Sequence, residues 1–174
     1  MLYDRSMNKT TMLTETVSAI TFDQFVAETD ARNNIQLNVT KWTLMLCDAL
    51  RQNYIDYSIR NHRRSIERLE GNTNTGINYH LKYIDELKAG NCEYSFVIES
   101  GTKYHKIIMV IDNGPGHSPS RSVHAFINRK TGEVYKSASW KSPAKGVRFD
   151  LRIINQREWL FENADWAGSY LYLK

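Results

Sequence analysis

The sequence predicts an α+β fold, in which N-terminal helices pack on an antiparallel β-meander of four to six strands. Up to about residue 90, apolar residues recur at steps of three and four, which is the period of a helix with one buried face. From Glu93 onward they recur at every second position, and turn-forming segments separate the apolar runs. This change of period divides the chain into a mainly helical part, residues 21–90, and a mainly β part, residues 91–174.

The length and composition favour a single domain. A chain of 174 residues, 41% of them hydrophobic, is long enough to bury one core and too short for two ordinary ones. Residues 1–20 are polar and rich in threonine, so we expect a flexible N-terminal arm before one domain over residues 21–174. We find no run of about eighteen apolar residues and no secretory leader, which predicts a cytoplasmic protein without a membrane span.

Two helices are expected before the first long loop. Thr21 followed by Gln24 forms a capping-box pattern, which predicts a short helix that ends near Asn34. Thr40 is expected to cap a second, much longer helix that runs to about Leu69, with a glycine beyond it as the stop signal.

Shorter elements are expected on either side of the strands. Thr73 or Thr75 can cap a third helix from about Gly76 to Lys88. Near the end of the chain, the pattern indicates a brief helix from Glu158 to Asn163 and a last strand from Ser169.

The strands are expected to follow one another as hairpins. Ser100 with Gly101 indicates a tight turn after the first strand, and the segment from Asn128 to Gly132 is typical of a hairpin connection. A fifth, shorter strand is expected around Phe149. The first four strands are predicted over residues 94–98, 103–111, 122–127 and 133–139.

No motif for catalysis, nucleotide binding or metal binding is present in the sequence. The phosphate-binding loop, the dinucleotide fingerprint, the serine nucleophile elbow, the zinc-protease motif and the calcium loop are all absent. Cys47 and Cys92 lack metal-ligand spacing, and no two of the five histidines are spaced as a metal pair. We therefore predict no cofactor and no metal, and we favour a non-enzymatic protein.

The basic character of the chain lies in its middle. Residues 101–152 carry ten lysines and arginines against three carboxylates, whereas the whole chain has a net charge of +4. Within this stretch the segment KSASWKSPAKGVR interleaves cations with one indole, a combination that binds a phosphate backbone and stacks a base. We expect the arginines at steps of four on the long helix to assist. The predicted nucleic-acid-binding residues are Arg121, Lys136, Trp140, Lys141, Lys145 and Arg148, with Arg60, Arg64 and Arg68. The alternative is a solvated surface with Trp140 buried in the core.

His124 is the candidate for a polar site. It lies in a predicted strand on the same side as Ser122 and Phe126, and it could face Tyr135 or Glu133 across the hairpin. With a carboxylate such as Glu99 or Asp112, it could act as an acid–base group. The alternative is a histidine hydrogen-bonded within the sheet.

The segment SVHAFINRKTGEVYKSASWKSPAKGVRFDL, together with the closing DWAGSYLYLK, resembles small uncharacterised proteins of tailed bacteriophages, including phages of marine bacteria. The resemblance covers about the last third of the chain, from Ser122 to Lys174. It implies a viral gene product in the cytoplasm of an infected bacterium or in the virion, and it implies no particular activity.

Three hypotheses on function follow. The first is a non-enzymatic protein that binds nucleic acid or another polyanion through the basic aromatic loop. The second is a protein-binding module, either a minor virion component or an inhibitor of a host protein, whose complex tolerates moderate salt. The third is an enzyme that uses His124, which requires a concave pocket around that residue.

Overall fold

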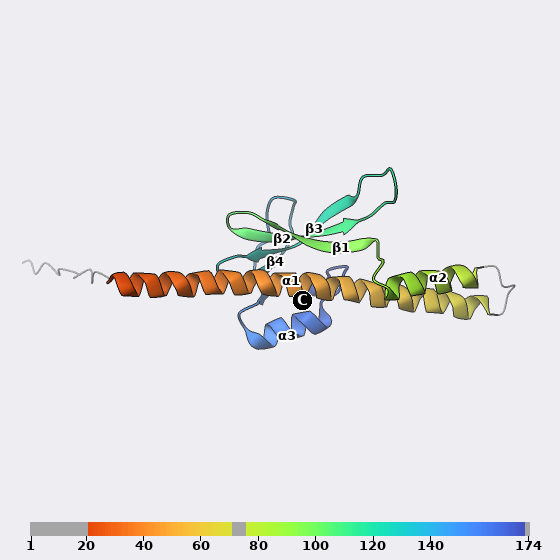
Figure 1. Cartoon of the computed structure of the whole chain (residues 1–174), viewed down its shortest axis with the longest axis horizontal. Coiled ribbons are helices and arrows are strands. Elements are labelled where there is room, and N and C mark those ends of the chain that lie inside the picture. Colours follow the sequence, from red (N-terminus) through yellow and green to blue (C-terminus); the bar gives the residue numbers. More distant parts are fainter. Residues whose placement is uncertain (1–20, 71–75, 173–174) are drawn as a thin grey trace, which may run out of the picture.

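The computed structural model describes residues 21–70 and 76–172, and it has the predicted α+β architecture. A long helix crosses the whole molecule, a sheet lies along one side of it, and two short helices pack against it (Figure 1). The predicted arm over residues 1–20 and the predicted caps Thr73 and Thr75 lie outside the described residues. The helices are α1 (Phe22–Leu69), α2 (Ile77–Lys88) and α3 (Ile154–Asn163), and the strands are β1 (Tyr94–Ser100), β2 (Tyr104–Ile111), β3 (Ser120–Asn128), β4 (Glu133–Lys136) and β5 (Phe149–Asp150).

Helix α1 is one continuous helix of 48 residues, and the predicted break between two helices is wrong. The capping box at Thr21 is confirmed, since the Gln24 amide donates to the Thr21 hydroxyl and the Thr21 amide donates to the Gln24 side chain. Thr40 is not a cap: its hydroxyl donates to the Gln36 carbonyl inside the helix. The segment contains neither glycine nor proline, and the moderate helix propensity of asparagine does not break a helix held by later packing.

The five strands form one antiparallel sheet in the order β1-β2-β3-β4-β5, which confirms the predicted meander. Strand β4 ends at Lys136, three residues earlier than predicted, because the chain there turns into a loop closed by a bridge between Ser137 and Pro143. A register shift between Ile107 and Ile108 in β2 leaves one extra residue in β3.

The end of the chain differs from the prediction. Helix α3 begins at Ile154, four residues before the predicted start. The predicted last strand is wrong, because Ser169–Leu171 forms a 3₁₀ turn. Gly168 precedes this turn with a φ of 81°, a left-handed conformation that glycine adopts without strain and that ends any extended segment.

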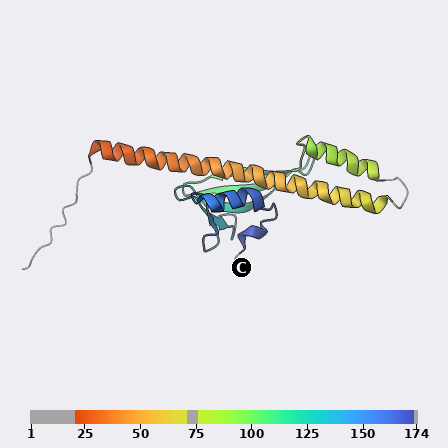
Figure 2. The same ribbon diagram turned by 90° about the horizontal axis from the view of Figure 1, so that it is seen from below.

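Helices α1 and α3 lie on one side of the sheet, and α2 packs along the end of α1 beyond the sheet (Figures 1 and 2). The main core forms between the middle of α1 and the sheet face toward it, here called the inner face. Val39, Leu46 and Leu50 of α1 are fully buried there, and α3 and the 3₁₀ turn complete the core. The opposite sheet face, here called the outer face, is not covered by any helix of residues 21–70 and 76–172.

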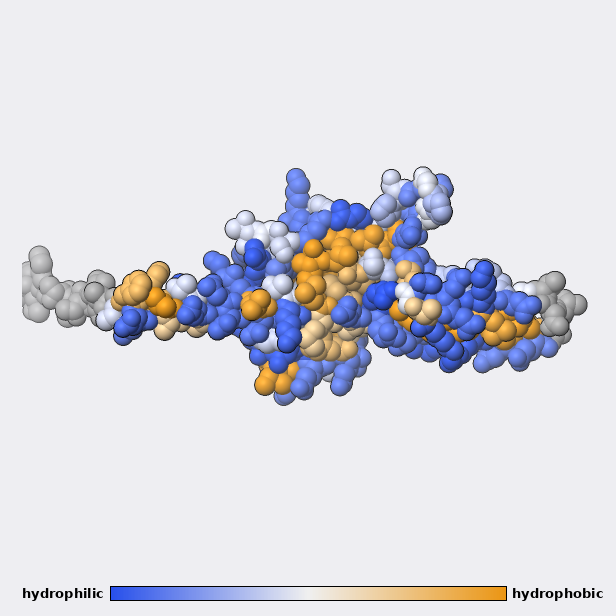
Figure 3. All heavy atoms as spheres, viewed as in Figure 1, coloured by the Kyte–Doolittle hydropathy of each residue, from blue (hydrophilic) through white to orange (hydrophobic). Residues whose placement is uncertain are grey.

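The first third of α1 projects beyond this core. In residues 22–38 only Thr29 and Gln36 are even partly buried. Phe22 and Leu37 are 78% and 69% exposed, and the space-filling view shows hydrophobic residues at the start of the helix (Figure 3). This segment therefore gains little packing energy from the described part of the chain, although its capping box stabilises its first turn.

A carboxylate joins three elements at the far end of the sheet. Glu93, just before β1, accepts hydrogen bonds from the hydroxyls of Tyr54 in α1, at 2.6 Å, and of Tyr83 in α2. Burial raises the pKa of Glu93, but the hydrogen bonds from the two tyrosines more than offset this and hold it below its ordinary value.

Replacing Leu46 by Ala should lower the free energy of unfolding by about 2–5 kcal/mol, because its fully buried side chain would leave a cavity. Leu44→Ala, on the same helix at a side chain that is 53% exposed, is the matched control and should cost much less. Chemical denaturation followed by circular dichroism measures both. Equal losses would contradict the assigned burial.

Glu93→Gln should lower the free energy of unfolding by about 1–2 kcal/mol at pH 7, because a neutral amide accepts the tyrosine hydrogen bonds more weakly. The carboxyl pKa is lower in the folded chain than in the unfolded chain. The contribution of Glu93 to the free energy of unfolding is therefore complete above the pKa of the unfolded chain. It is lost as pH falls through the pKa of the folded chain. Denaturation from pH 7 to pH 3 should show the difference between wild type and variant shrinking in acid, and a constant difference would contradict this linkage.

Candidate nucleic-acid interface

The outer face of the sheet carries charged and aromatic side chains. Strand pairing aligns Glu99, Lys106, Phe126 and Tyr135 in one row across four strands. Tyr104 belongs to the same surface, since its ring meets the rings of Phe126 and Tyr135 edge-on at 5.8 and 6.0 Å. Phe126 is only 1% exposed, whereas Tyr104 and Tyr135 are partly exposed. Single-stranded nucleic acids stack their bases on exposed aromatic rings of a sheet face.

Trp140 lies over this face. The Lys106 ammonium is 5.5 Å from the centre of the indole ring, and the Arg121 guanidinium carbon is 5.6 Å from it. Arg121 also donates to the Glu99 carboxylate on β1, which holds the guanidinium in place. Contacts of this kind between cations and an indole are attractive. The indole is nevertheless 42% exposed, so the alternative of a tryptophan buried in the core does not apply.

The loop that carries Trp140 has a defined shape. The hydroxyl of Ser139 accepts hydrogen bonds from the amides of Lys141 and Ser142, both at 3.2 Å. At the base of the loop, the Ala144 amide donates to the Lys136 carbonyl at 2.8 Å. Lys141 is exposed beside the indole, and Lys145 is exposed further along the same loop. We call the indole, its two neighbours Lys106 and Arg121, and these two loop lysines the Trp140 cluster.

The other predicted cations lie elsewhere. Lys136 points to the inner side, where its ammonium is 4.7 Å from the centre of the Tyr172 ring. Arg148 donates to the carbonyls of Leu171, Lys145 and Gly146, and therefore ties the loop to the C-terminal segment. The exposed arginines of the long helix lie beyond the sheet, next to α2 and away from the loop (Figure 1). These are Arg60, Arg64 and Arg68.

Lys106 is the member of the cluster that the sequence did not reveal as a site residue. The pattern that could have identified Lys106 is the period of two in β2, which places Lys106 on one face with Tyr104 and Ile108. The partner across the strand depends on the register, and the bulge changes that register next to these residues.

His124 is the extra residue of the β-bulge. Ala125 pairs with Ile107 and Val123 pairs with Ile108, so His124 between them has no partner and leaves the regular alternation. It therefore turns to the inner side with Ser122, whereas Phe126 faces outward, and the predicted common side for all three is wrong.

The predicted partner of His124 is also on the other face. The hydroxyl of Tyr135 donates to the Glu133 carboxylate at 2.8 Å, while His124 Nε2 is hydrogen-bonded to the hydroxyl of Tyr170 at 2.9 Å. Burial lowers the pKa of His124 to about 4, although the charge of Asp165 opposes this shift. His124 is therefore neutral at physiological pH, and no carboxylate is hydrogen-bonded to it among the described residues.

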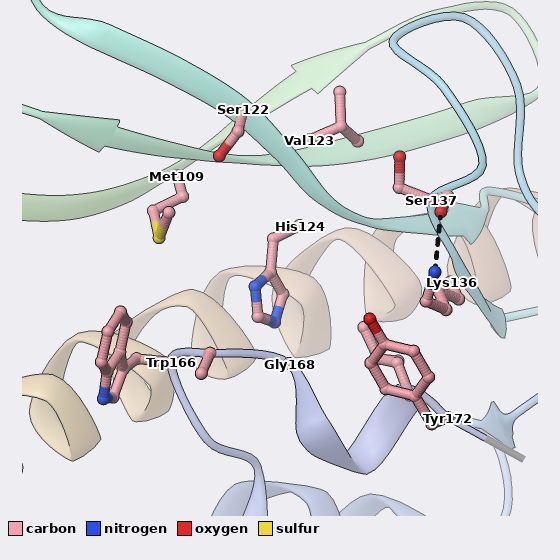
Figure 4. Close-up of a pocket in the computed structure, with 11 residues that line it drawn as sticks. Met109, Ser122, Val123, His124, Lys136, Ser137, Trp166, Gly168 and Tyr172 are labelled. Atoms are coloured by element: carbon pink, nitrogen blue, oxygen red, sulfur yellow. Dashed lines mark hydrogen bonds between the residues drawn. The ribbon is translucent and has the colours of Figure 1, made fainter.

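A cleft of about 330 Å³ opens beside His124. Figure 4 shows its ring between those of Trp166 and Tyr172, with Lys136 and two serine hydroxyls nearby. The cleft is formed by the end of β4, the bulged part of β3 and the C-terminal segment. It is the concave surface that the third hypothesis requires around His124.

Residues 21–70 and 76–172 contain neither a candidate metal site nor a candidate membrane-spanning helix. No group of three histidine, cysteine or acidic side chains in these residues is placed to hold a metal ion. None of the helices formed by the same residues has both the length and the apolar character needed to cross a bilayer.

Comparison with known proteins identifies a family without an assigned function. No curated protein and no solved structure matches the chain. Residues 22–173 match the model of a family described as a family of unknown function, DUF7717. The match begins at the first residue of α1 and includes the sheet, the Trp140 loop and the cleft beside His124. The chain therefore belongs to the DUF7717 family.

Proposed function

We propose that this protein binds single-stranded nucleic acid on the outer face of its sheet and is not an enzyme. The observation that carries the proposal is the position of Trp140, which is held next to Lys106 and Arg121 and is still 42% exposed. A stacking surface surrounded by cations is what a single strand requires, because bases stack on aromatic rings while phosphates need positive charge.

Each part of the Trp140 cluster has a separate role in this proposal. The exposed part of the indole stacks one base, which contributes about 1–3 kcal/mol. Lys141 and Lys145 contact phosphates and add no sequence preference, so their contribution falls as salt rises. The hydrogen bonds within the loop order it before binding, which reduces the entropy lost on association. The resemblance to phage proteins suits this role, because single strands arise while a viral genome is replicated.

A second candidate function is a protein-binding module. It is favoured by the projecting part of α1, where Phe22, Phe25 and Leu37 are all more than half exposed. Helices with an apolar face commonly dock in grooves of partner proteins. A complex formed by such contacts tolerates moderate salt, whereas binding to a single strand through the Trp140 cluster weakens with salt.

Trp140→Ala should weaken binding of a fluorescent single-stranded oligonucleotide by about 5- to 150-fold, because one stacking interaction is lost. Lys141→Ala with Lys145→Ala should weaken binding more at low salt than at high salt. Lys82→Ala with Lys88→Ala on α2 removes the same charge from another exposed surface and is the matched control. Fluorescence anisotropy at 50 and 200 mM salt measures all four proteins.

Two outcomes would overturn the proposal. One is the absence of binding to single-stranded DNA and RNA at the lower salt concentration. The other is equal weakening by the loop pair and the control pair, which would assign the binding to net charge and not to the Trp140 cluster.

A further inference from the structure

We propose that the cleft beside His124 binds one nucleotide, either a free mononucleotide or the terminal residue of a strand lying on the outer face. The inference deepens the proposed function, since it assigns a second contact to the same class of ligand. Mononucleotide and strand end share their chemistry, a heteroaromatic ring with a phosphate, and the experiment below separates these two sources.

The cleft exists because β3 extends beyond its neighbour. Strand β4 pairs only with Ala125, Phe126 and Ile127. Residues 120–124 of β3 therefore have no β4 partner on that edge, and the chain after Lys136 leaves the sheet as the Trp140 loop. The C-terminal segment passes below this gap, so the cleft opens between it and β3 (Figure 4).

The lining of the cleft fits a flat ring with an anionic group. Trp166 and Tyr172 present aromatic rings on opposite sides of His124 (Figure 4). The Lys136 ammonium lies over one face of the Tyr172 ring, and it takes part in none of the ion pairs found between described residues. The ring positions suit base stacking, and the ammonium supplies the charge for a phosphate.

His124 supplies a hydrogen bond without a charge. Its Nε2 is engaged by the hydroxyl of Tyr170, and no hydrogen bond from the described residues reaches its Nδ1. Because burial keeps the ring neutral, Nδ1 can meet a polar edge of a base as a hydrogen-bonding partner. The hydroxyl of Ser122 offers a further donor and acceptor on the wall of the cleft, and the hydroxyl of Ser137, which donates to the Ser139 carbonyl, offers an acceptor.

The size and the position of the cleft limit the ligand to one residue of a strand. Its volume of about 330 Å³ is near the lower end of small-molecule sites, which span about 300–1,000 Å³. Arg121 of the Trp140 cluster and Ser122 of the cleft are neighbours on β3 and point to opposite faces. A strand stacked on Trp140 can therefore reach the cleft by passing round the free edge of β3.

The test is a binding titration of the full chain with adenosine and uridine monophosphates, followed by calorimetry. Lys136→Met and Tyr172→Ala should each weaken binding at least tenfold. Tyr79→Ala is the matched control, because Tyr79 and Tyr172 are both 64% exposed and Tyr79 lies on α2. Circular dichroism of each variant confirms that it is folded.

A second arm uses oligonucleotides with and without a terminal phosphate. If the cleft takes the end of a strand, removing the phosphate weakens wild type tenfold and has no effect on Lys136→Met. If it takes a free nucleotide, only the monophosphates respond to Lys136→Met.

The two proposals fail in different ways. The cleft proposal would be overturned if Lys136→Met and Tyr172→Ala bound the monophosphates as tightly as wild type does, and if neither variant changed the affinity for oligonucleotides. In that case a loss of oligonucleotide binding in Trp140→Ala would leave the outer-face function in place. Monophosphate binding without any oligonucleotide binding would overturn the outer-face function and support the cleft.

Discussion

The structure depends on the burial of one stripe of α1 against the inner face of the sheet. A five-stranded meander in which β5 has only two residues buries too little apolar surface to be stable by itself. An isolated helix of 48 residues has no other element to pack against. Val39, Leu46 and Leu50 join the two, and their burial removes apolar surface from water on both sides. Because α3 and the C-terminal turn pack on the same side, no helix of the described residues covers the outer face, where Ile108 and Phe126 are buried among other side chains.

The sequence was sufficient to predict the α+β class and the order of the five strands. The change of hydrophobic period near Glu93, the capping box at Thr21 and the hairpin turns each depend on neighbouring residues, so they can be recognised locally. The continuity of α1 through Asn33 and Asn34 could not be recognised in this way, because weak local preferences are overridden when a helix is held further along its length. The strand predicted from Ser169 is a 3₁₀ turn instead, because the Asp165 carboxylate accepts hydrogen bonds from the amides of Ser169 and Tyr170.

The site was less predictable than the fold. Trp140 and its loop lysines are close in sequence, and they were identified as a group. Whether that indole is exposed depends on how the loop folds over β2 and β3, which are separate in sequence. The β-bulge determines where the other candidate residue lies. His124 is its extra residue, and it turns to the inner side, away from Tyr135. A shift of one residue in register is invisible in a pattern with a period of two, yet it moves a side chain from one face of a sheet to the other.

The length of α1 affects how the whole protein moves in solution. A helix of 48 residues measures about 72 Å, whereas a compact chain of 174 residues has a radius of gyration of only about 16 Å. Tumbling about the helix axis is therefore much faster than tumbling end over end. Amide bonds along α1 and those in the strands will report different rotational correlation times. The monomer will also elute from a sizing column as if it were a heavier particle.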